Sequence, residues 1–221
     1  MTRIAVVGGH GAVARLLHPL LVAAGHTPVA LVRREEQADA VAALGAEARM
    51  LDIEAADAAT FAAAFEGCEA VVFAAGGGPD GNTERKRTVD LEGSTKSIEG
   101  ARLAGIRRFV QVSAMGVDEP VGDDTSPVWQ AYVEAKRDAD AALRASDLDW
   151  TVVRPGGLTD DEPTGLVEVG ATVSRGSIPR ADVAAVVAAC IDDPSTVGAQ
   201  FELVSGDVPV GEAIAAAPHP A

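Results

Sequence analysis

The chain has little cysteine, few aromatic side chains and no long apolar run. Its only cysteines, Cys68 and Cys190, form no Cys-x-x-Cys pair and are too few for a disulfide scaffold. Aromatic residues make up 4% of the 221 residues. No stretch approaches the roughly 18 uninterrupted apolar residues of a membrane-spanning helix, and the segment MTRIAVVGG lacks the long apolar region of a signal peptide. These features favour a cytoplasmic protein with reduced thiols.

Basic residues are also scarce. The chain has 18 Lys and Arg against 33 Asp and Glu, which gives a formal net charge of −15 at pH 7. Because such a chain repels phosphate backbones and anionic lipid, nucleic acid and membrane surfaces are not expected partners. We expect a small-molecule substrate, no metal ion, and either a monomer or a homodimer.

What the chain has instead is a regular alternation of strand-length apolar runs and helical segments, which is typical of βαβ units around a parallel sheet. Strands are expected at residues 3–7, 28–32, 47–51, 70–74, 107–113, 150–154 and 200–204. Helices are expected near residues 12–24, 35–44, 57–65, 84–104, 128–145 and 181–192. We therefore predict an α/β fold with a doubly wound parallel sheet of about seven strands flanked by helices.

The length suits one well-buried domain over residues 1–221, with a small substrate-side portion from about residue 155 to the end. Three long loops follow strands, at 76–83, 116–127 and 155–165. Because the carboxyl ends of parallel strands meet at one edge of a sheet, these loops predict a ligand cleft there.

The segment GGHGAVA follows the first expected strand and opens the first expected helix. In a dinucleotide-binding turn of this spacing, Gly8 allows the tight turn, Gly11 lets the backbone approach the pyrophosphate, and Ala14 lets helix and strand pack closely. The amides at the helix N-terminus would then face the phosphates. The expected cofactor residues here are Gly8, Gly9, His10, Gly11, Ala12 and Val13, with His10 as an exposed spacer. The alternative is a strand-helix turn with incidental glycines.

The second strand ends in LVRREE, where a dehydrogenase selects its cofactor. An Asp or Glu there holds the ribose 2′-OH of NAD, whereas an Arg accommodates the 2′-phosphate of NADP. Arg33 and Arg34 therefore predict NADP(H), and Arg33 is the better candidate because it is nearer the strand. The alternative is that both arginines are solvated at a helix start, where Glu35 and Glu36 partly neutralise them.

Two further segments complete the expected cofactor site. Asp52, followed by Ile53, comes after the third strand and is expected to accept a hydrogen bond from the adenine amino group, or else to cap a helix. Ala74, Ala75 and Gly76 end the fourth strand in small residues, which let the backbone lie flat against the cofactor's ribose and adenine. A plain flexible loop is the alternative for that segment.

The single tyrosine of the chain stands four residues before one of its three lysines. On one helix this spacing puts Tyr132 and Lys136 on the same face. Lys136 is expected to lower the pKa of Tyr132 from about 10 and so fit it for general acid or base work. Ser113 closes the fifth strand, where its hydroxyl would bind a substrate carbonyl, or else serve a turn or cap. The alternative for WQAYVEAK is a helix on which Trp129 and Tyr132 simply pack inward.

Together these segments resemble the short-chain dehydrogenase/reductase superfamily, in particular its atypical, single-domain NAD(P)H-binding branch with epimerase-like, flavin-reductase-like and NmrA-like members. The resemblance runs from GGHGAVA through AYVEAKRDADAALRASDLDWTVVRPGGLTD to SIPRADVAAVVAACIDDP. It implies a Rossmann fold with Tyr132, Lys136 and Ser113 as catalytic residues. It also implies that Lys136 binds the nicotinamide ribose and that the backbone at Pro155 and Gly156 meets the nicotinamide end. The first turn lacks the threonine of the Gly-Ala-Thr-Gly sequence common in this branch.

The leading hypothesis is an NADPH-dependent oxidoreductase that reduces a small carbonyl or similar acceptor. A non-catalytic NADP(H)-binding sensor or interaction protein would need the same glycine loop and arginines without the catalytic residues. A nucleotide-sugar epimerase or dehydratase would use the same residues but needs a sizeable C-terminal domain. Only 66 residues (221 − 155) follow Pro155, which disfavours that third hypothesis.

Acidic residues are frequent in the two loops expected to border the substrate. They are Asp118, Glu119, Asp123, Asp124, Asp160, Asp161 and Glu162. They would disfavour strongly anionic substrates if they face the cleft, or they form solvated surface.

Overall fold

The seven expected strands form the parallel part of one sheet. The computed structural model describes residues 1–78, 81–122 and 125–218. The strands are β1 (Arg3–Val7), β2 (Thr27–Val32), β3 (Glu47–Met50), β4 (Ala70–Phe73), β5 (Arg108–Val112), β6 (Asp149–Pro155) and β10 (Ala199–Ser205). They lie side by side in the order β3-β2-β1-β4-β5-β6-β10, all parallel. This is the doubly wound Rossmann arrangement, and the strand order reverses between β1 and β4.

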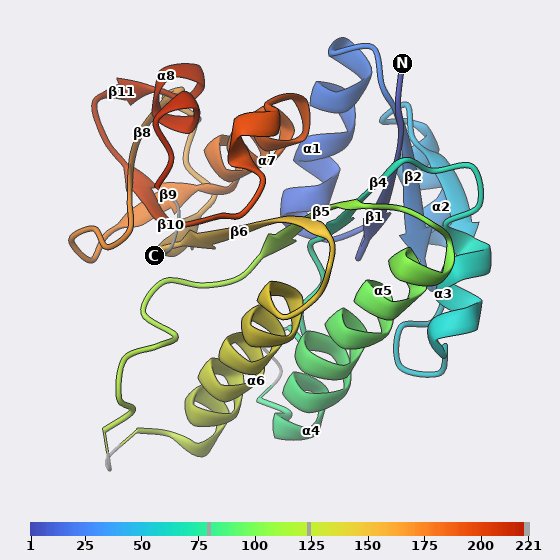
Figure 1. Ribbon diagram of the computed structural model, residues 1–221, viewed down its shortest axis with the longest axis horizontal. Coiled ribbons are helices and arrows are strands. Elements are labelled where there is room, and N and C mark those ends of the chain that lie inside the picture. The colour runs from blue at the N-terminus through green and yellow to red at the C-terminus, as the bar shows by residue number, and fades with distance from the viewer. Residues whose placement is uncertain (79–80, 123–124, 219–221) are drawn as a thin grey trace.

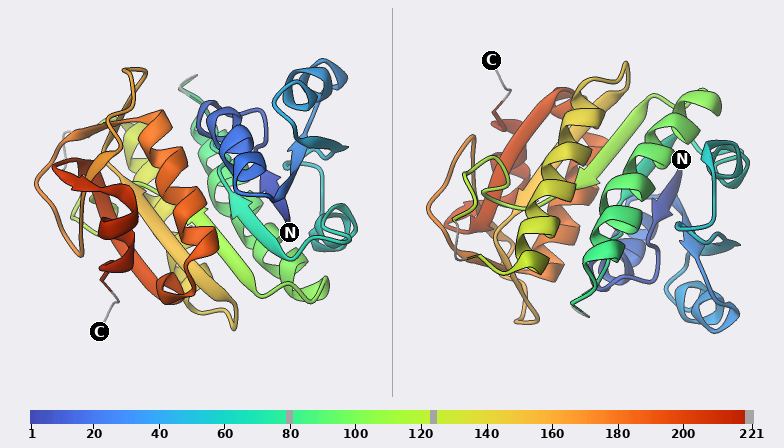
Figure 2. Two further views of the ribbon diagram at one scale, coloured as in Figure 1. Left: turned by 90° about the horizontal axis from the view of Figure 1, so that it is seen from above. Right: turned by 90° about the horizontal axis from the view of Figure 1, so that it is seen from below.

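Helices cover both faces of the sheet, as Figures 1 and 2 show. On one face lie α1 (Ala12–Ala23), α2 (Glu35–Ala42), α7 (Arg180–Asp192) and α8 (Val210–Ala215); on the other lie α3 (Ala58–Ala64), α5 (Glu92–Leu103) and α6 (Pro127–Arg144). A short turn of 3-10 helix, η2 (Pro194–Thr196), leads into β10.

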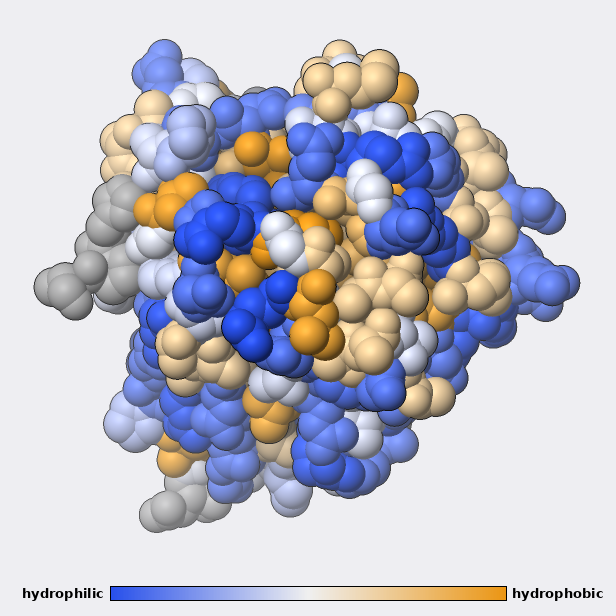
Figure 3. Space-filling model, turned by 45° about the vertical axis from the view of Figure 1, so that its right-hand side comes forward, coloured by the Kyte–Doolittle hydropathy of each residue, from blue (hydrophilic) through white to orange (hydrophobic). Residues whose placement is uncertain are grey.

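Alternating residues of each strand supply the two cores. In β1, Ile4 and Val6 pack toward α1 and α7, while Ala5 and Val7 pack toward α3 and α5. Except for the largely exposed edge strand β3, these strands are buried on both faces and are near-continuous apolar runs, which is why the sequence predicted them correctly. On the face drawn in Figure 3, hydrophilic and hydrophobic side chains are interspersed. Within the described ranges, no helix has the length and apolar character to span a membrane.

The prediction of about seven strands was too low, because the C-terminal part adds short ones. β8 (Leu166–Gly170) pairs antiparallel with β10, and β11 (Val208–Pro209) extends that edge to make a nine-stranded sheet. β7 (Gly157–Thr159) and β9 (Ser177–Pro179) form a separate two-stranded ribbon inside a segment predicted to start as a loop. These edge strands are half exposed and carry no apolar run, so hydrophobic patterning does not reveal them.

The helix predicted at 84–104 consists of three segments. α4 (Thr83–Arg85) leads into a π-helix, η1 (Lys86–Leu91), and then into α5. Within η1 both Lys86 and Asp90 are buried. Residues four apart nearly coincide around the wider turn of a π-helix, so these two charged side chains project toward the same side.

We predict that two glycines in helices respond oppositely to replacement by alanine. A Cβ atom on Gly100 of α5 would lie 2.5 Å from Cβ of Phe61 in α3, so Gly100→Ala should cost about 1–3 kcal/mol of unfolding free energy. A Cβ on Gly211 of α8 meets no atom of the described residues within 4 Å, so Gly211→Ala should be neutral or stabilising by up to about 1 kcal/mol. Urea denaturation of both variants measures this. Equal effects would show that helix propensity, not helix packing, dominates at Gly100.

Candidate functional site

Two adjoining hollows open at the carboxyl ends of the parallel strands. The first, the groove, has a volume of about 250 Å³ and the second, the cleft, about 770 Å³. They share Ala74, Ala75 and Gly76 at the end of β4, beside the point where the strand order reverses. An elongated ligand bound across both would therefore cross the sheet where dinucleotides bind in this class of fold.

Most of the predicted site residues line these hollows. The groove is lined by Gly8, His10, Gly11, Arg33, Asp52, Ile53, Ala74, Ala75 and Gly76. The cleft is lined by Val13, Ser113, Tyr132, Lys136, Pro155 and Gly156, together with the shared residues 74–76. Of the predicted set, Gly9, Ala12 and Arg34 line neither hollow.

The glycine loop is shaped by close backbone approaches. Gly8 has φ +77°, and a Cβ there would lie 2.7 Å from Cα of Ala75. Gly9 turns away from the groove: its N–H donates to the carbonyl of Leu31 (3.0 Å), and a Cβ would lie 2.7 Å from that of Ala30. Gly11 precedes α1 without any side-chain cap. The first amides of α1 are therefore left for a ligand, at the positive end of the helix dipole.

His18, which sequence reasoning did not single out, supports this loop from behind. The fully buried imidazole donates from Nε2 to the carbonyl of Gly9 over 2.7 Å. Burial lowers the pKa of His18, and the Gly9 carbonyl opposes this in part. The ring therefore holds the loop as a neutral group. The available signal was its place on the buried face of α1, one residue after Leu17.

Charged side chains gather at the outer end of the groove. Arg33 Nη1 lies 3.8 Å from Oε2 of Glu54, and Arg85 Nε lies 3.7 Å from the same oxygen. Arg34 points elsewhere, 3.9 Å from Glu36. The carboxylate of Asp52 accepts the N–H of Glu54 (3.0 Å), while α3 is capped by Asp57, so the suggestion that Asp52 caps a helix is wrong.

Helix α6 carries Tyr132, Lys136 and Asp140 at four-residue intervals along one face. Lys136 is only 5% exposed, and its Nζ lies 3.1 Å from Oδ1 of Asp90. The same ammonium donates to the carbonyls of Val112 (3.3 Å) and Ala75 (3.5 Å) and lies 5.9 Å from the centroid of the Tyr132 ring. Despite burial, these neighbours raise the pKa of Lys136, with Asp90 the largest favourable influence. Lys136 is therefore a fixed cation beneath the tyrosine.

The expected lowering of the Tyr132 pKa is wrong in direction. Burial raises the pKa of Tyr132, and the nearby Lys136 charge offsets only part of that rise. Asp90 and Asp140 push in the same direction as burial. Tyr132 is thus protonated throughout the neutral range, which is the form that a proton donor requires.

Ser113 uses its hydroxyl proton inside the protein. Its Oγ donates to Oδ2 of Asp140 (2.8 Å), which also accepts Nε of Arg154 (2.9 Å). Gln111 Nε2 donates to the other oxygen of Asp140 (2.7 Å). Ser113 therefore presents oxygen lone pairs to the cleft, which differs from the expected donation to a substrate carbonyl. Sequence reasoning missed Asp140, although it continues the four-residue spacing from Lys136.

Trp129 borders the cleft instead of packing inward. The residue is 51% exposed, and the centroid of its ring lies 5.3 Å from that of the Tyr132 ring. The interpretation of WQAYVEAK as a purely inward-packing helix face is therefore wrong for Trp129. The half-exposed indole provides an apolar wall next to the tyrosine.

The loop acids do not line the cleft where the structure describes them. Asp118, Glu119 and Asp160 each pair with an arginine, namely Arg154, Arg175 and Arg180. Asp161 and Glu162 are exposed. Asp123 and Asp124 lie outside the described residues. The five described acids therefore form surface, the second of the two alternatives.

Comparison with known proteins agrees with this geometry. Residues 8–194 match the model of an NAD(P)H-binding family. The chain belongs to this family. It is oxidoreductase-like, and the resemblance to the atypical short-chain dehydrogenase/reductase branch is confirmed.

Three relatives cover nearly the whole chain. The uncharacterized sugar epimerase YhfK of Bacillus subtilis is 37% identical over 213 residues, 96% of this chain and 98% of its own. A solved structure from Bacillus halodurans, provisionally named an NAD-dependent epimerase/dehydratase, has a TM-score of 0.91 at 40% identity, covering 98% of this chain and all of that one. ChuY of Escherichia coli O157:H7, an anaerobilin reductase, has a TM-score of 0.75 at 26% identity, covering 94% of this chain and 98% of that one.

We predict that the single tyrosine, Tyr132, loses its proton at higher pH than an unperturbed tyrosine. Because Tyr132 is the chain's only tyrosine, the phenolate absorbance of the folded protein reports this residue alone. We expect the signal to appear at higher pH than for an unperturbed tyrosine, whose pKa is about 10, because burial raises the pKa of Tyr132. Lys136→Met should move the transition to still higher pH, since it removes the cation that favours the phenolate. A midpoint below that of an unperturbed tyrosine in the wild-type protein would contradict this account.

Proposed function

We propose that the protein is an NADPH-dependent reductase of a small carbonyl or similar acceptor, with Tyr132, Lys136 and Ser113 at its reaction centre. The observation that carries the proposal is the placement of Tyr132 and Lys136 in a cleft that continues directly into the groove of the glycine loop and Arg33. A nicotinamide cofactor spanning both hollows would bring its reacting end to the tyrosine.

The residues present fit such a cofactor. The tight glycine turn and the uncapped start of α1 supply amides for a pyrophosphate. The small residues 74–76 leave room along the floor, and Arg33 stands where a 2′-phosphate would lie. Lys136 would hold the nicotinamide ribose, and the backbone of Pro155 and Gly156 would border the nicotinamide end. When bound, the cofactor supplies the hydride that the protein's own side chains cannot provide.

The side chains then divide the remaining work. The Tyr132 phenol, protonated at neutral pH, donates its proton to the acceptor oxygen as negative charge develops there. Lys136 stabilises the resulting phenolate through its fixed positive charge. Ser113 accepts a hydrogen bond from a donor group on the bound molecule, while Asp140 keeps its hydroxyl oriented. Trp129 covers the apolar side and limits the access of water.

Reduction is proposed over sugar epimerisation, although two relatives carry epimerase names. Within the described residues, the segment after Pro155 forms β10, α7, α8 and the edge strands that complete the sheet, not a separate domain around the nucleotide of a nucleotide sugar. The relative ChuY, which is named an anaerobilin reductase, supports the choice of a reductase.

A second candidate is a non-catalytic NADP(H)-binding protein, and one contact favours it. Ser113 donates its hydroxyl to Asp140 and so does not offer a proton to an acceptor. Such a protein would bind the cofactor without turning it over.

We predict a preference for NADPH over NADH that depends on Arg33. Charge-assisted hydrogen bonds to a 2′-phosphate are worth about 1.5–3 kcal/mol, so Arg33→Ala should weaken NADPH binding by about 10- to 100-fold and leave NADH binding nearly unchanged. Arg34→Ala removes the same charge from a side chain outside the groove and serves as the matched control. Quenching of intrinsic tryptophan fluorescence during titration gives the affinities. Equal NADPH and NADH affinities in the wild-type protein would contradict the NADP assignment.

We predict that Tyr132→Phe abolishes turnover but not cofactor binding. Loss of the proton donor should lower kcat for any accepted carbonyl by about 100-fold or more. The measurement is NADPH oxidation across a panel of small aldehydes, ketones and quinones. A wild-type protein that binds NADPH tightly but reduces no acceptor would favour the non-catalytic candidate.

A further inference from the structure

The cleft is lined by more positive than negative side chains, although the chain as a whole is acidic. Lys86, Lys136, Arg175 and Arg180 border it, against the single carboxylate of Asp90. The lining therefore carries a formal charge of +3 (4 − 1) within a chain of net charge −15. A positive cleft with low-dielectric walls concentrates anions.

Three of the four cations have carboxylate partners within the protein. Lys136 pairs with Asp90 (3.1 Å), Arg175 with Glu119 (2.5 Å) and Arg180 with Asp160 (2.7 Å). The two arginine pairs involve exposed carboxylates at the rim, and exposed pairs of this kind contribute little to stability. Rearranging these two ion pairs around a ligand therefore costs little free energy.

Lys86 is the exception. Lys86 is only 6% exposed, yet among the described residues its side chain makes one hydrogen bond, from Nζ to the carbonyl of Gly78, and pairs with no carboxylate. Its Nζ lies 5.6 Å from the centroid of the Tyr132 ring. The ring attracts the cation but does not neutralise it. An ammonium has three N–H donors, so Lys86 retains donors and an uncompensated charge at the wall of the cleft.

The π-helical segment η1 places the side chains of Lys86 and Asp90 on the same side. Asp90 is already paired with Lys136 and accepts the N–H of Gly77 (2.8 Å). Burying a charge is costly unless an opposite charge or several hydrogen bonds compensate it. Among the described residues, Asp90 is the one carboxylate that forms an ion pair with either of the two buried lysines beside Tyr132, and it pairs with Lys136.

We propose that Lys86 binds a carboxylate of the acceptor, so that the substrate is a small organic acid whose carboxylate lies within a few bonds of the reducible group. The inference rests on the proposed reductase function. The reducible group must meet Tyr132, and the short distance from Lys86 to the Tyr132 ring limits how far the carboxylate can lie from it. Arg175 and Arg180 at the rim draw the acid into the cleft.

The anion at Lys86 belongs to the substrate and not to the cofactor. The glycine loop and Arg33, which are suited to phosphates, line the groove, whereas Lys86 lines the cleft with Tyr132 and Trp129. A neutral acceptor of the same shape would leave the positive charge of Lys86 without an opposite charge. The site should therefore discriminate between an acid and its amide.

The test compares an acid with its isosteric amide on the NADP⁺-loaded protein, in which no turnover occurs. Benzoate and benzamide are titrated separately, with the fluorescence of Trp129 and Trp150 and calorimetry as readouts. We expect the wild-type protein to prefer benzoate by about tenfold or more, as for a charge-assisted hydrogen bond. Lys86→Met should reduce that preference to within about twofold, while Lys86→Arg retains most of it.

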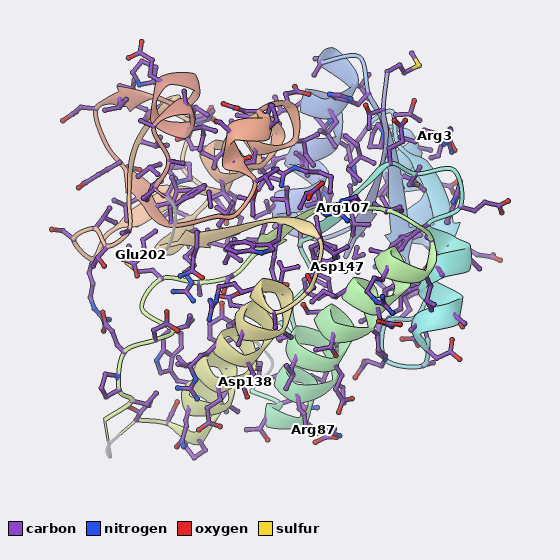
Figure 4. The ribbon with its side chains drawn as sticks, in the orientation of Figure 1. Arg3, Arg87, Arg107, Asp138, Asp147 and Glu202 are labelled. Atoms are coloured by element: carbon purple, nitrogen blue, oxygen red, sulfur yellow. The ribbon has the colours of Figure 1, made fainter. Side chains whose placement is uncertain are left out.

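Arg87→Met is the matched control, because it removes a positive charge from the neighbouring position. Arg87 pairs with Glu84 and Glu92 on the surface and stands at the outer end of this segment in Figure 4. It should leave the benzoate preference unchanged. If Lys86→Met fails to fold, ¹⁵N-lysine labelling of the wild-type protein replaces it. With only three lysines in the chain, the Nζ resonance of Lys86 should shift with benzoate and not with benzamide.

Each outcome separates this inference from the proposed function. No discrimination between benzoate and benzamide in the wild-type protein overturns the inference, as does a Lys86→Met protein that discriminates fully. A Lys86→Met protein that loses affinity for NADP⁺ instead would assign the anion to the cofactor and also overturn it. Failure of the wild-type protein to bind NADP⁺ at all would overturn the proposed function itself.

Discussion

Buried charges hold helix α6 against the sheet, and the position of each candidate catalytic group depends on them. Lys136 reaches Asp90 in η1, and four residues further along the helix Asp140 reaches Arg154 at the end of β6. Removing one partner of such a pair leaves the other charge buried and uncompensated, a loss of several kcal/mol. The helix therefore has one energetically acceptable position and rotation. Tyr132, one turn before Lys136, is placed by the same two contacts, so the ion pairs that fix the helix also aim the phenol into the cleft.

The hydrogen bonds around Asp140 determine which side chain of the site has a proton to donate. Ser94 donates to Gln111, Gln111 and Ser113 donate to Asp140, and Arg154 joins Asp140 to Asp118 near the surface. Gln111, Ser113 and Arg154 all donate to the carboxylate of Asp140, so the hydroxyl proton of Ser113 is used within the protein and its lone pairs face the cleft. Tyr132 has no such commitment in the contacts of the described residues. The proton available for chemistry is therefore that of the phenol, and burial keeps it in place at neutral pH.

Local features of the fold and site were accessible from the sequence, whereas long-range ones were not. The strands inside the parallel sheet are buried on both faces and so stand out as apolar runs. Gly8, Gly11, Tyr132 and Lys136 lie in short motifs whose spacing has a geometric meaning. Asp90 lies 46 residues before Lys136 in sequence (136 − 90), and no local pattern indicates that the two side chains meet. Lys86 stands in ERKRTVD, which has the composition of a solvated surface, yet it is buried within the π-helical segment η1. The pKa of Tyr132 is raised because the side chain is buried, and the spacing between Tyr132 and Lys136 in the sequence does not indicate how deeply a side chain is buried.

The distribution of charge explains how an acidic chain can bind small anionic ligands. A net charge of −15 spread over the surface disfavours polyanions and membranes, which present extended arrays of negative charge. A single cofactor or small acid needs only a few cations, provided that these lie in a recess where water screens them poorly. Lys86 in the cleft occupies such a place, whereas Arg33, which lines the groove, is half exposed. Arg175 and Arg180 at the rim are paired with exposed acids that a ligand can displace. Selectivity for small anions over large ones then follows from geometry, because only a small molecule can reach the recessed cations without bringing its remaining charge against the acidic surface.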